Sequence, residues 1–308
     1  MPSNQNPLGA LPARFRRGRV LVVGCGDVGL RAAGALVGRM RVLALTSTPS
    51  RVPGLRERGV VPLVGNLDAP QTLRRLAGIA DRVLHLAPPR GEGQEQWWRD
   101  RRTQALLQAL RLRTPPAALV YASTSGVYGD CGGALVDETR AVAPHTPRAQ
   151  RRVDAERQLR VFGRTGGTRV NVLRVPGIYA ADRPGGTPRE RLLKGTPVLV
   201  AQDDVYTNHI HADDLARALL AALWRGRAQR IYNASDDTVL KMGDYFDLAA
   251  DLYGLPRPPR VARSTAQEQL PLVLLSFMGE SRRLDNTRLK RELRLVLRHP
   301  TVASGLGA

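Results

Sequence analysis

The sequence predicts an α/β fold of the doubly wound type, in which helices cover both faces of a parallel sheet. Short apolar runs without polar interruption alternate with segments of helical periodicity, which is the pattern of strands buried on both faces. A glycine-rich turn lies directly between the first apolar run and the first helical segment. The composition, with 43% hydrophobic and 24% charged residues, is typical of a globular protein and argues against disorder, collagen and coiled coil.

The expected elements follow one another from residue 19 onward. Strands are expected at residues 20–23, 42–45, 60–64, 83–86, 118–121 and 170–173. Helices are expected at residues 27–39, 71–78, 99–113 and 148–163. After about residue 175 the alternation loosens, although two further helices are expected at residues 212–224 and 241–253. Because helices separate many of the early strands, these strands can lie parallel in one sheet.

The charge balance is unusual, with 47 basic against 27 acidic residues and a formal net charge of +20. Such a balance raises the question of nucleic-acid binding, since clustered cations release counterions from phosphates. All but three of the basic residues are arginine, however, and they are spread along the whole chain rather than gathered in one stripe. We therefore do not predict a nucleic-acid partner.

Membrane, secreted and metal-binding classes are also disfavoured. No apolar run approaches the ~20 residues that cross a bilayer, and the N-terminal residues lack the apolar stretch of a signal peptide. Cys25 and Cys131 are too few for a disulfide framework and have no metal-ligand spacing, so no metal site is predicted. We expect a cytoplasmic protein with no membrane partner.

The glycine-rich turn has the sequence GCGDVG and contains Gly24, Gly26 and Gly29. In a strand-turn-helix setting, the first glycine permits a tight turn, the second lets backbone amides approach a pyrophosphate, and the third allows close packing of the helix on the strand. The helix N-terminus adds free amides and partial positive charge. We therefore predict a dinucleotide site that includes Asp27 and Val28, with a turn that binds no ligand as the alternative.

The end of the second strand indicates which dinucleotide is bound. An NAD site usually has an acidic residue about 20 positions after the first glycine, where it accepts hydrogen bonds from the ribose. Here Thr46, Ser47 and Arg51 stand in this region without a carboxylate. Hydroxyls and a guanidinium can hold a 2′-phosphate that a carboxylate would repel. We predict NADP as the preferred cofactor and NAD as the alternative.

These observations divide the chain into three parts. Residues 1–18 have no periodicity and are expected to form a flexible tail. Residues 19–175 are expected to form a Rossmann-type NAD(P)-binding domain. Residues 176–308 are expected to form a smaller substrate-binding region, partly interleaved with that domain and packed on the carboxyl ends of the strands.

Several later segments, together with the glycine loop, resemble the extended short-chain dehydrogenase/reductase superfamily, in particular the NAD-dependent epimerase/dehydratase branch and its atypical members. The matching segments are residues 65–67, 85–89, 122–129, 173–179 and 210–216. Their order and spacing cover roughly residues 19–300, and the STSGVYG segment at residues 123–129 is fairly specific.

The resemblance also implies roles for individual residues. Those implied to hold the cofactor are Asn66 and Leu67 at the adenine, Leu86, Ala87 and Pro88 on the ribose side, and Pro176 near the nicotinamide. Thr124 matches the catalytic Ser/Thr, whose hydroxyl binds the oxygen of the substrate carbonyl or alcohol. Simple turn chemistry at a strand end is the alternative for Thr124. Ser125 and His209 are expected to contact the substrate.

The catalytic dyad is where the chain departs from the family pattern. The family has a Tyr, a Lys four residues later and usually a Glu four residues after that Lys. If Glu156 is this Glu, Arg152 occupies the Lys position and Arg148 the Tyr position. Arginine stays protonated at any working pH and cannot shuttle a proton. Arg152 can still hold the nicotinamide ribose and lower the pKa of a neighbouring group, or it can be a solvated helix residue.

An acid or base must then come from elsewhere in the chain. The residues that can titrate or donate a proton are Tyr128, His145, Tyr179, His209 and His211. Tyr128 stands with Thr124 and Arg152 among the catalytic candidates, although a structural role is commoner for it in this motif. His211 is expected to order the turn before a helix, which leaves His209 as the better candidate for the substrate pocket.

Two functions are compatible with these features. The first is an NAD(P)-dependent oxidoreductase or epimerase/dehydratase that transfers a hydride to or from a small carbonyl or sugar-nucleotide-like substrate while Thr124 polarises the oxygen. The second is a non-catalytic NADP-binding regulatory or assembly protein that has lost its proton-transfer dyad. We favour the first. The expected partner is a small-molecule substrate, with a homodimer as the candidate assembly.

Overall fold

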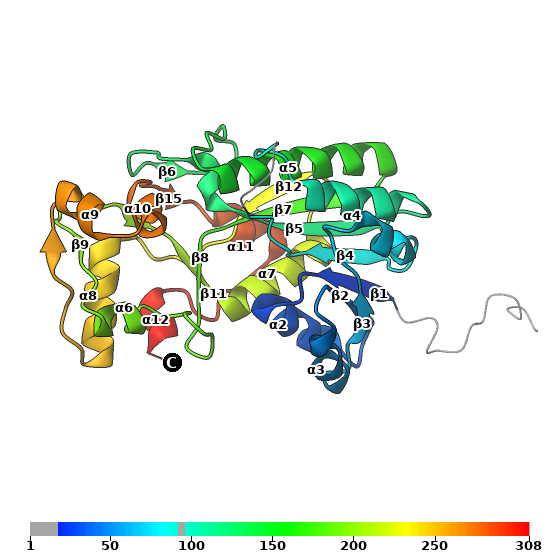
Figure 1. Cartoon of the computed structure of the whole chain (residues 1–308), viewed down its shortest axis with the longest axis horizontal. Helices are drawn as coiled ribbons and strands as arrows, with labels where there is room; N and C mark the ends of the chain where they lie inside the picture. Colours follow the sequence, from blue (N-terminus) through cyan, green and yellow to red (C-terminus); the bar gives the residue numbers. More distant parts are fainter. Residues whose placement is uncertain (1–17, 92–95, 308) are drawn as a thin grey trace, which may run out of the picture.

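A seven-stranded parallel sheet runs through the larger part of the molecule, in the order β12-β7-β5-β4-β1-β2-β3 (Figure 1). The computed structural model describes residues 18–91 and 96–307, so the tail predicted over residues 1–18 lies outside the described residues apart from Gly18. The strands are β1 (Arg19–Val23), β2 (Arg41–Thr46), β3 (Val61–Val64), β4 (Arg82–His85), β5 (Ala118–Thr124), β7 (Arg169–Val175) and β12 (Arg230–Asn233). The doubly wound α/β fold and its six predicted strands are confirmed.

Alternate residues of the strands enter two different hydrophobic cores, one on each face of the sheet. In β1, Val20 and Val22 pack into one core, whereas Leu21 and Val23 pack into the other. All four are fully buried, as expected of a strand that is covered on both sides. The first face is covered by α2 (Asp27–Leu36), α3 (Val52–Glu57), α7 (Ala212–Arg225) and α11 (Thr287–Leu293), and the second by η2 (Pro70–Leu76), α4 (Arg101–Arg111) and α5 (Pro147–Gly166).

The predicted helices are present with small shifts of their ends, apart from one difference in type. The segment predicted as an α-helix at residues 71–78 is the 3-10 helix η2, which has a proline in its first turn. Its Leu73 and Leu76 are three residues apart and are both fully buried against the sheet. A spacing of three residues is the repeat of a 3-10 helix, so these two side chains share one face.

The order of the strands changes direction at β1, and this creates the crevice of the fold. β1 pairs in parallel with β2 on one side and with β4 on the other. Chain connections leave this point in opposite directions, so the loops after β1 and β4 diverge at the carboxyl ends of the strands. Only β4 separates β1 from β5, which places the ends of these two strands about 10 Å apart.

A smaller lobe is built around helix α8 (Met242–Tyr253), away from the main sheet (Figure 1). Tyr245 and Phe246 of α8 form a separate core with Val198, Leu199 and Val302. The other elements of this lobe are α6 (Arg189–Leu193), β9 (Val198–Leu199), β14 (Arg260–Val261), α9 (Arg263–Gln269), α10 (Leu272–Met278) and α12 (Val302–Leu306).

Short strand pairs connect the lobe to the sheet. The parallel pairs are β8 (Gly177–Tyr179) with β11 (His209–His211) and β6 (Leu135–Val136) with β15 (Arg283–Leu284), and β10 (Tyr206–Thr207) is antiparallel to β13 (Leu240–Lys241). The chain after residue 176 therefore divides between two cores. Its α7, β12 and α11 pack on the main sheet, whereas α6, α8 and α12 build the lobe.

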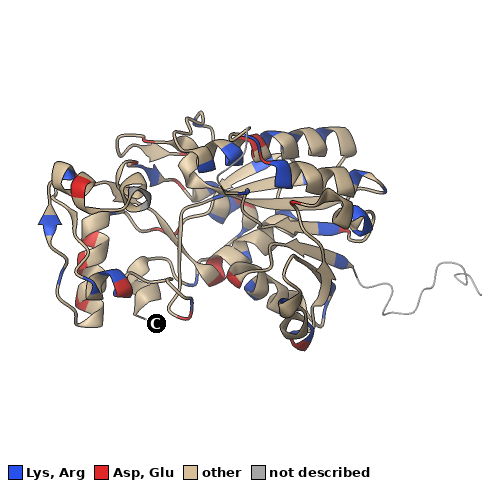
Figure 2. Ribbon diagram, viewed as in Figure 1, with Lys and Arg blue, Asp and Glu red and all other residues tan. Residues whose placement is uncertain are grey.

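Charged residues are distributed over most of the described surface. Figure 2 shows Lys and Arg on helices of both faces of the sheet as well as in the smaller lobe, where acidic residues accompany them along α8. Many of these arginines belong to ion pairs, such as Arg31 with Asp213 at 2.6 Å and Arg260 with Asp247 at 2.6 Å. None of the helices in the described part of the chain has the length and apolarity needed to cross a membrane.

Candidate active site

The glycine loop between β1 and α2 is shaped by close contacts at two of its three glycines. Gly24 has a φ of +89°, and a Cβ atom added there would lie 2.7 Å from the Cα atom of Ala87. A Cβ atom at Gly29 would lie 2.9 Å from the carbonyl oxygen of Gly24. Larger residues at either position would displace backbone, which explains the glycines on structural grounds. Gly26 differs, because a Cβ atom there would meet no heavy atom within 4 Å.

The open space at Gly26 lies at the N-terminus of α2. Gly26 is the N-cap residue of this helix and supplies no side-chain hydrogen bond, so the amides of the first turn keep their donor capacity. Free amides at a helix N-terminus, beside a residue without a side chain, are suited to a pyrophosphate. Asp27 and Val28 form the first helical residues, with Asp27 paired to Arg31 at 3.1 Å. The loop therefore fits the dinucleotide that the sequence predicts.

Cationic residues lie at the end of β2, next to the glycine loop. Arg51 donates a hydrogen bond to the carbonyl oxygen of Cys25 at 2.6 Å, which holds its guanidinium beside the loop. The charges of Arg51 and Arg58 both act on the Cys25 thiol, although burial dominates and raises the pKa of that thiol. Thr46 is buried and forms a turn with Thr48, whereas Ser47 is exposed. This arrangement leaves Ser47 and Arg51 available to a ligand.

The remaining residues that the sequence assigned to the cofactor lie at the ends of β3, β4 and β7. Leu86 and Ala87 donate their amides to the carbonyl oxygen of Val23, so the end of β4 is bound to the glycine loop. Pro88 is exposed, and its carbonyl accepts a hydrogen bond from Arg102. The residues after β3, Asn66 and Leu67, form a turn in which the Asn66 side chain accepts a hydrogen bond from the amide of Asp68 at 3.0 Å. Pro176 lines the pocket described below.

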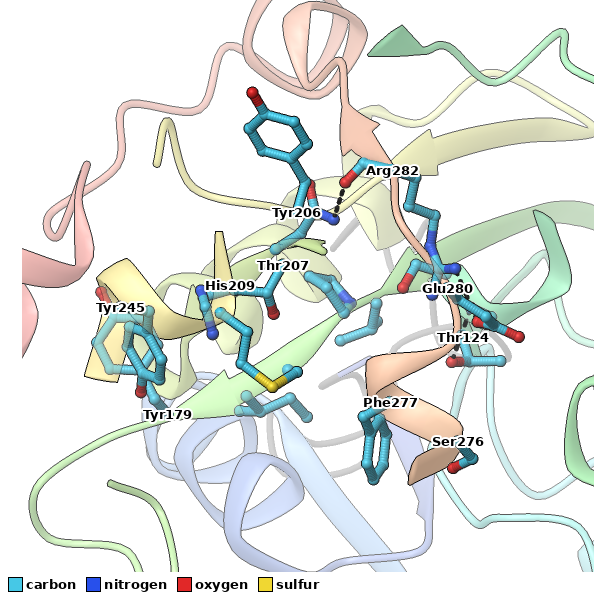
Figure 3. Close-up of a pocket in the computed structure, with 18 of the residues that line it drawn as sticks. Thr124, Tyr179, Tyr206, Thr207, His209, Tyr245, Ser276, Phe277, Glu280 and Arg282 are labelled. Atoms are coloured by element: carbon cyan, nitrogen blue, oxygen red, sulfur yellow. Dashed lines mark hydrogen bonds and ion pairs between the residues drawn. The ribbon is translucent and has the colours of Figure 1, made fainter. Parts of the chain in front are cut away.

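A pocket of about 630 Å³ lies at the carboxyl ends of β5 and β7, where the sheet meets the smaller lobe (Figure 3). Its walls come from the ends of these strands, the start of α5, the short strands β8, β10 and β11, α6 with the segment before it, the start of α8 and the segment from α10 to β15. The pocket is therefore close to the expected position of a nicotinamide, because the dinucleotide loop is only two strands away. Its lining is both polar and aromatic.

Thr124 and Ser125 stand at the point where β5 enters the pocket. The Thr124 hydroxyl accepts a hydrogen bond from the amide of Gly126 at 3.3 Å and caps the 3-10 helix η3 (Ser125–Tyr128). The side chain nevertheless lines the pocket and is half-buried, whereas Ser125 is buried. The proton of the Thr124 hydroxyl stays available, because the hydroxyl oxygen accepts the hydrogen bond from the Gly126 amide. Turn chemistry and a substrate contact are therefore compatible at Thr124.

The two arginines at the expected dyad positions both line the pocket. Arg152 donates hydrogen bonds to the carbonyl oxygen of Ala122 at 2.6 Å and to the Tyr121 hydroxyl at 3.0 Å. These bonds hold its guanidinium against β5. Arg148 lies with its guanidinium carbon 5.3 Å from the centre of the Phe277 ring, and burial together with the charge of Arg152 lowers the pKa of Arg148. Neither group can exchange a proton at neutral pH, but both bring positive charge to the pocket.

The glutamate used to place these arginines is part of a buried network. Glu156 accepts a hydrogen bond from the Ser123 hydroxyl at 2.6 Å and pairs with Arg174 at 2.8 Å. Tyr128 lies under the Arg174 guanidinium and donates its hydroxyl to the side-chain oxygen of Asn233 at 2.7 Å. It is almost fully buried and is absent from the pocket lining, so the structure gives this catalytic candidate a structural position.

The other acid/base candidates occupy different places. His209 lines the pocket and stacks on Tyr245, with ring centres 4.2 Å apart. Burial lowers the pKa of His209 to about 4, so its ring is neutral at pH 7. Tyr179 also lines the pocket but donates its hydroxyl to the carbonyl of Thr301. His211 caps α7 through its Nδ1 atom, as the sequence predicts, and His145 is exposed outside the pocket lining.

Glu280 is a pocket residue that sequence reasoning missed. It is the one acidic side chain among the described residues that line the pocket, and Figure 3 shows it beside Thr124. A Cβ atom on Gly126 would lie 3.6 Å from the Thr124 hydroxyl and 3.9 Å from a Glu280 carboxylate oxygen, so both oxygens border the same small space. Arg282 pairs with Glu280 at 2.7 Å and is also absent from the sequence prediction. No motif surrounds these residues in the sequence.

One group of side chains in the described part of the chain has the spacing of metal ligands. Ligand atoms of His211, Asp213 and His299 lie within 4.8 Å of one another. The His211 Nδ1 atom, however, already accepts the amide of Asp213, and Arg31 donates to the Asp213 carboxylate at 2.6 Å. The two imidazole rings contact each other in a tilted arrangement, with centres 3.8 Å apart. These contacts occupy the group in the packing of α7.

Comparison with known proteins gives both a family and structural neighbours. The model of the NAD dependent epimerase/dehydratase family matches residues 20–235. A conserved protein of unknown function from Silicibacter pomeroyi is similar, with 29% identity, coverage of 94% of this chain and 97% of that chain, and a TM-score of 0.76. No curated protein matches the chain.

Two epimerase structures are similar at lower identity. One is a UDP-glucose 4-epimerase from Thermotoga maritima with UDP-glucose, at 19% identity, 94% and 96% coverage and a TM-score of 0.76. The other is a UDP-glucuronic acid 4-epimerase from Bacillus cereus in complex with NAD, at 19% identity, 94% and 96% coverage and a TM-score of 0.72. At this identity, the two similarities establish the fold.

Proposed function

The chain belongs to the NAD-dependent epimerase/dehydratase family, and from this premise we propose that it is an NADP-preferring oxidoreductase or epimerase/dehydratase acting on a sugar-nucleotide-like alcohol or carbonyl. The observation that carries this proposal is the position of the pocket. Thr124 and Glu280 meet at the end of β5, two strands from a glycine loop whose open side and free amides suit a dinucleotide. The carboxylate beside that hydroxyl favours catalysis over binding alone, because it can accept a proton at the substrate oxygen.

The roles of the pocket residues follow from their chemistry. When bound, the nicotinamide would supply or accept the hydride. Thr124 would donate its hydroxyl to the substrate oxygen. Glu280 would accept the proton of a substrate alcohol as the carbon is oxidised and would return it on reduction. Arg282 donates a hydrogen bond to the Glu280 carboxylate at 2.7 Å, which would hold this proton acceptor in place beside Thr124.

The arginines in place of the dyad would act through charge alone. Arg152 is anchored on β5 and would hold the ribose next to the nicotinamide. Arg148 would add positive charge near the substrate oxygen as negative charge develops there. Glu280 thus supplies the proton transfer that a family member with Tyr and Lys obtains from its dyad.

The preference for NADP is supported by the end of β2. Arg51 is held beside the loop by the Cys25 carbonyl, and the neighbouring Ser47 is exposed without a carboxylate in the same turn. A guanidinium and a hydroxyl are suited to a 2′-phosphate. NAD is the cofactor of the Bacillus cereus neighbour, so NAD is the alternative.

The test combines binding with turnover. The full-length protein is titrated with NADPH and with NADH by fluorescence, and then incubated with NADP⁺ or NAD⁺ and either UDP-glucose or UDP-glucuronic acid. We expect tighter binding of NADPH than of NADH and the appearance of reduced cofactor or of an epimerised sugar. Failure to bind either dinucleotide would refute the proposal, and binding without any turnover would favour a regulatory protein.

A further inference from the structure

The residue after the proposed base is Ser281, and a short loop at residues 129–133, directly after η3, holds it in place. The Ser281 amide donates a hydrogen bond to the Asp130 carboxylate at 2.7 Å. The Ser281 carbonyl oxygen accepts from the amides of Cys131 and Gly133, each at 3.0 Å. Both backbone polar groups of Ser281 are therefore bound to this one loop.

Two glycines give the loop the shape that these contacts require. Gly132 and Gly133 have φ values of +58° and +77°, in the left-handed region that glycine adopts without strain. One oxygen of the Asp130 carboxylate, Oδ1, accepts both the Gly132 amide at 3.2 Å and the Ser281 amide. The bond from the Ser281 amide contributes most to lowering the pKa of Asp130 below its usual value, so this carboxylate is charged at pH 7.

The same loop reaches the Glu280 carboxylate through a side chain. Arg282 donates from Nη1 to the Gly129 carbonyl oxygen at 2.8 Å and to the Glu280 carboxylate at 2.7 Å. Glu280 is thus held through its carboxylate by Arg282 and through its backbone by Ser281. Both contacts lead to the loop that η3 joins to Thr124, so the hydroxyl and the carboxylate are held relative to one short segment (Figure 3).

Without these contacts, the segment that carries Glu280 would be a short irregular connection. Residues 279–282 link the end of α10 to β15 and belong to no helix or strand. Met278 before them is buried in the core of the smaller lobe, and Leu284 after them pairs with β6. A connection between two such fixed points can still direct its carboxylate away from Thr124. The hydrogen bonds to the 129–133 loop select the direction toward Thr124.

We propose that Asp130 is a positioning residue, which binds the Ser281 amide and thereby keeps the Glu280 carboxylate beside Thr124. Asp130 is exposed and lies outside the pocket lining, so it would act on the reaction only through Glu280. This role rests on the proposed function, because the direction of the carboxylate affects a rate only where it takes a proton from the substrate.

The first measurement is amide hydrogen exchange on the full-length protein without cofactor or substrate. Asp130→Ala should raise the exchange rate of residues 279–282 by about tenfold or more, because the Ser281 amide loses its acceptor and the segment opens more often. Asp137→Ala is the matched control and should leave these rates unchanged. Asp137 is also exposed and also accepts the amide two residues later, but its hydrogen bonds come from Thr139.

The second measurement is turnover with NADP⁺ and an active sugar nucleotide. Asp130→Ala should lower kcat by about 10- to 100-fold, because the base is displaced from the substrate, and should leave the NADPH affinity within about twofold. On the Glu280→Gln background the same change should lower kcat less than about twofold further, because the group that Asp130 positions is already absent. Asp130→Asn keeps an acceptor oxygen and should restore kcat to within about threefold of the wild type.

A purely structural role would give a different pattern, because Asp130→Ala would then lower kcat by the same factor with and without Glu280→Gln. That pattern, unchanged kcat, unchanged exchange at residues 279–282, or equal changes in Asp137→Ala would overturn the proposal. If Asp130→Ala does not fold, Asp130→Glu replaces it, since the longer side chain cannot place one oxygen between the same two amides. Absence of turnover in the wild type would refute the proposed function, and the exchange rates would then decide whether Asp130 holds the Glu280 segment.

Discussion

The crevice has two parts that are built in different ways. The glycine loop with the end of β2 is called the cofactor half, and the pocket at the ends of β5 and β7 is called the substrate half. The cofactor half depends on one continuous loop, in which Gly24 and Gly29 are fixed by contacts with backbone and Arg51 is fixed by a carbonyl oxygen. The substrate half brings together residues as far apart in the chain as Thr124 and Arg282. It also keeps polar atoms of Arg191 and His209 buried without partners. The first half is complete in itself, whereas the second would be completed by its ligand.

The largest effects are expected at Gly24 and Gly26 of the cofactor half. A substitution at Gly24 should affect mainly folding, whereas one at Gly26 should affect mainly cofactor binding. Gly24→Val should lower the free energy of unfolding by more than about 3 kcal/mol. The valine side chain would collide with the backbone of Ala87, and residue 24 would have to keep a positive φ. Gly26→Val should change it by less than about 1 kcal/mol, since the added atoms enter open space. The same variant should weaken NADPH binding by about a hundredfold or more, because the side chain would occupy the place of the pyrophosphate.

Urea denaturation and NADPH titration of both variants check this pair. Gly34→Ala is the control, because Gly34 lies in α2, the helix that follows the loop, has open space around it, and this substitution is expected to be neutral or stabilising. Equal losses of stability at Gly24 and Gly26, or unchanged NADPH affinity in Gly26→Val, would contradict the division of roles within the loop.

The same contrast explains how much the sequence could predict. The sheet, its helices and the glycine loop could be predicted because a strand, a turn and a helix within about 20 residues contain the whole pattern. The position of Thr124 in the pocket lining could be anticipated because it ends β5 within a recognisable segment. Glu280, Arg282 and Arg191 could not, because they reach the pocket from loops and short helices whose positions depend on the packing of the smaller lobe.

Tyr128 illustrates a second limit. The STSGVYG segment shows that a tyrosine follows Thr124 by four positions, but not the direction of its side chain. The 3-10 turn after Thr124 directs Tyr128 inward, where Arg174 and Asn233 engage it. That direction is decided by residues about 50 and 100 positions away, so no local pattern could have shown it.

A change at the reacting end of the substrate half should have the next largest effect. Glu280→Gln keeps the size of the side chain but removes the proton acceptor, so kcat with NADP⁺ and an active sugar nucleotide should fall by about 10²- to 10⁴-fold. NADPH affinity and melting temperature should stay near those of the wild type. Glu268→Gln, on α9 and outside the pocket lining, is the control. A loss below about threefold would exclude Glu280 as the base.

Asp236, a buried residue next to His209 of the substrate half, should make the stability of the protein depend on pH. The Asp236 amide donates to the His209 carbonyl at 2.7 Å, and burial raises the pKa of Asp236 to about 7 from 3.8. The folded state therefore binds this proton more tightly than the unfolded state, so the stabilisation is full below pH 4 and is lost as the pH rises through 7. Between these limits the wild type should lose about 4 kcal/mol relative to Asp236→Asn. Urea denaturation from pH 4 to 8 measures this, and parallel pH profiles would contradict it.

The smallest effect is expected at Arg51, an exposed arginine of the cofactor half. Arg51 is solvated and already donates to the Cys25 carbonyl. Its contact with a 2′-phosphate should therefore be worth less than a buried one. Arg51→Ala should weaken NADPH binding by about tenfold, with little change for NADH. Arg56→Ala, exposed on α3, is the control. Equal changes for both dinucleotides would show that Arg51 shapes the loop rather than selecting NADP, because only NADPH carries the additional phosphate.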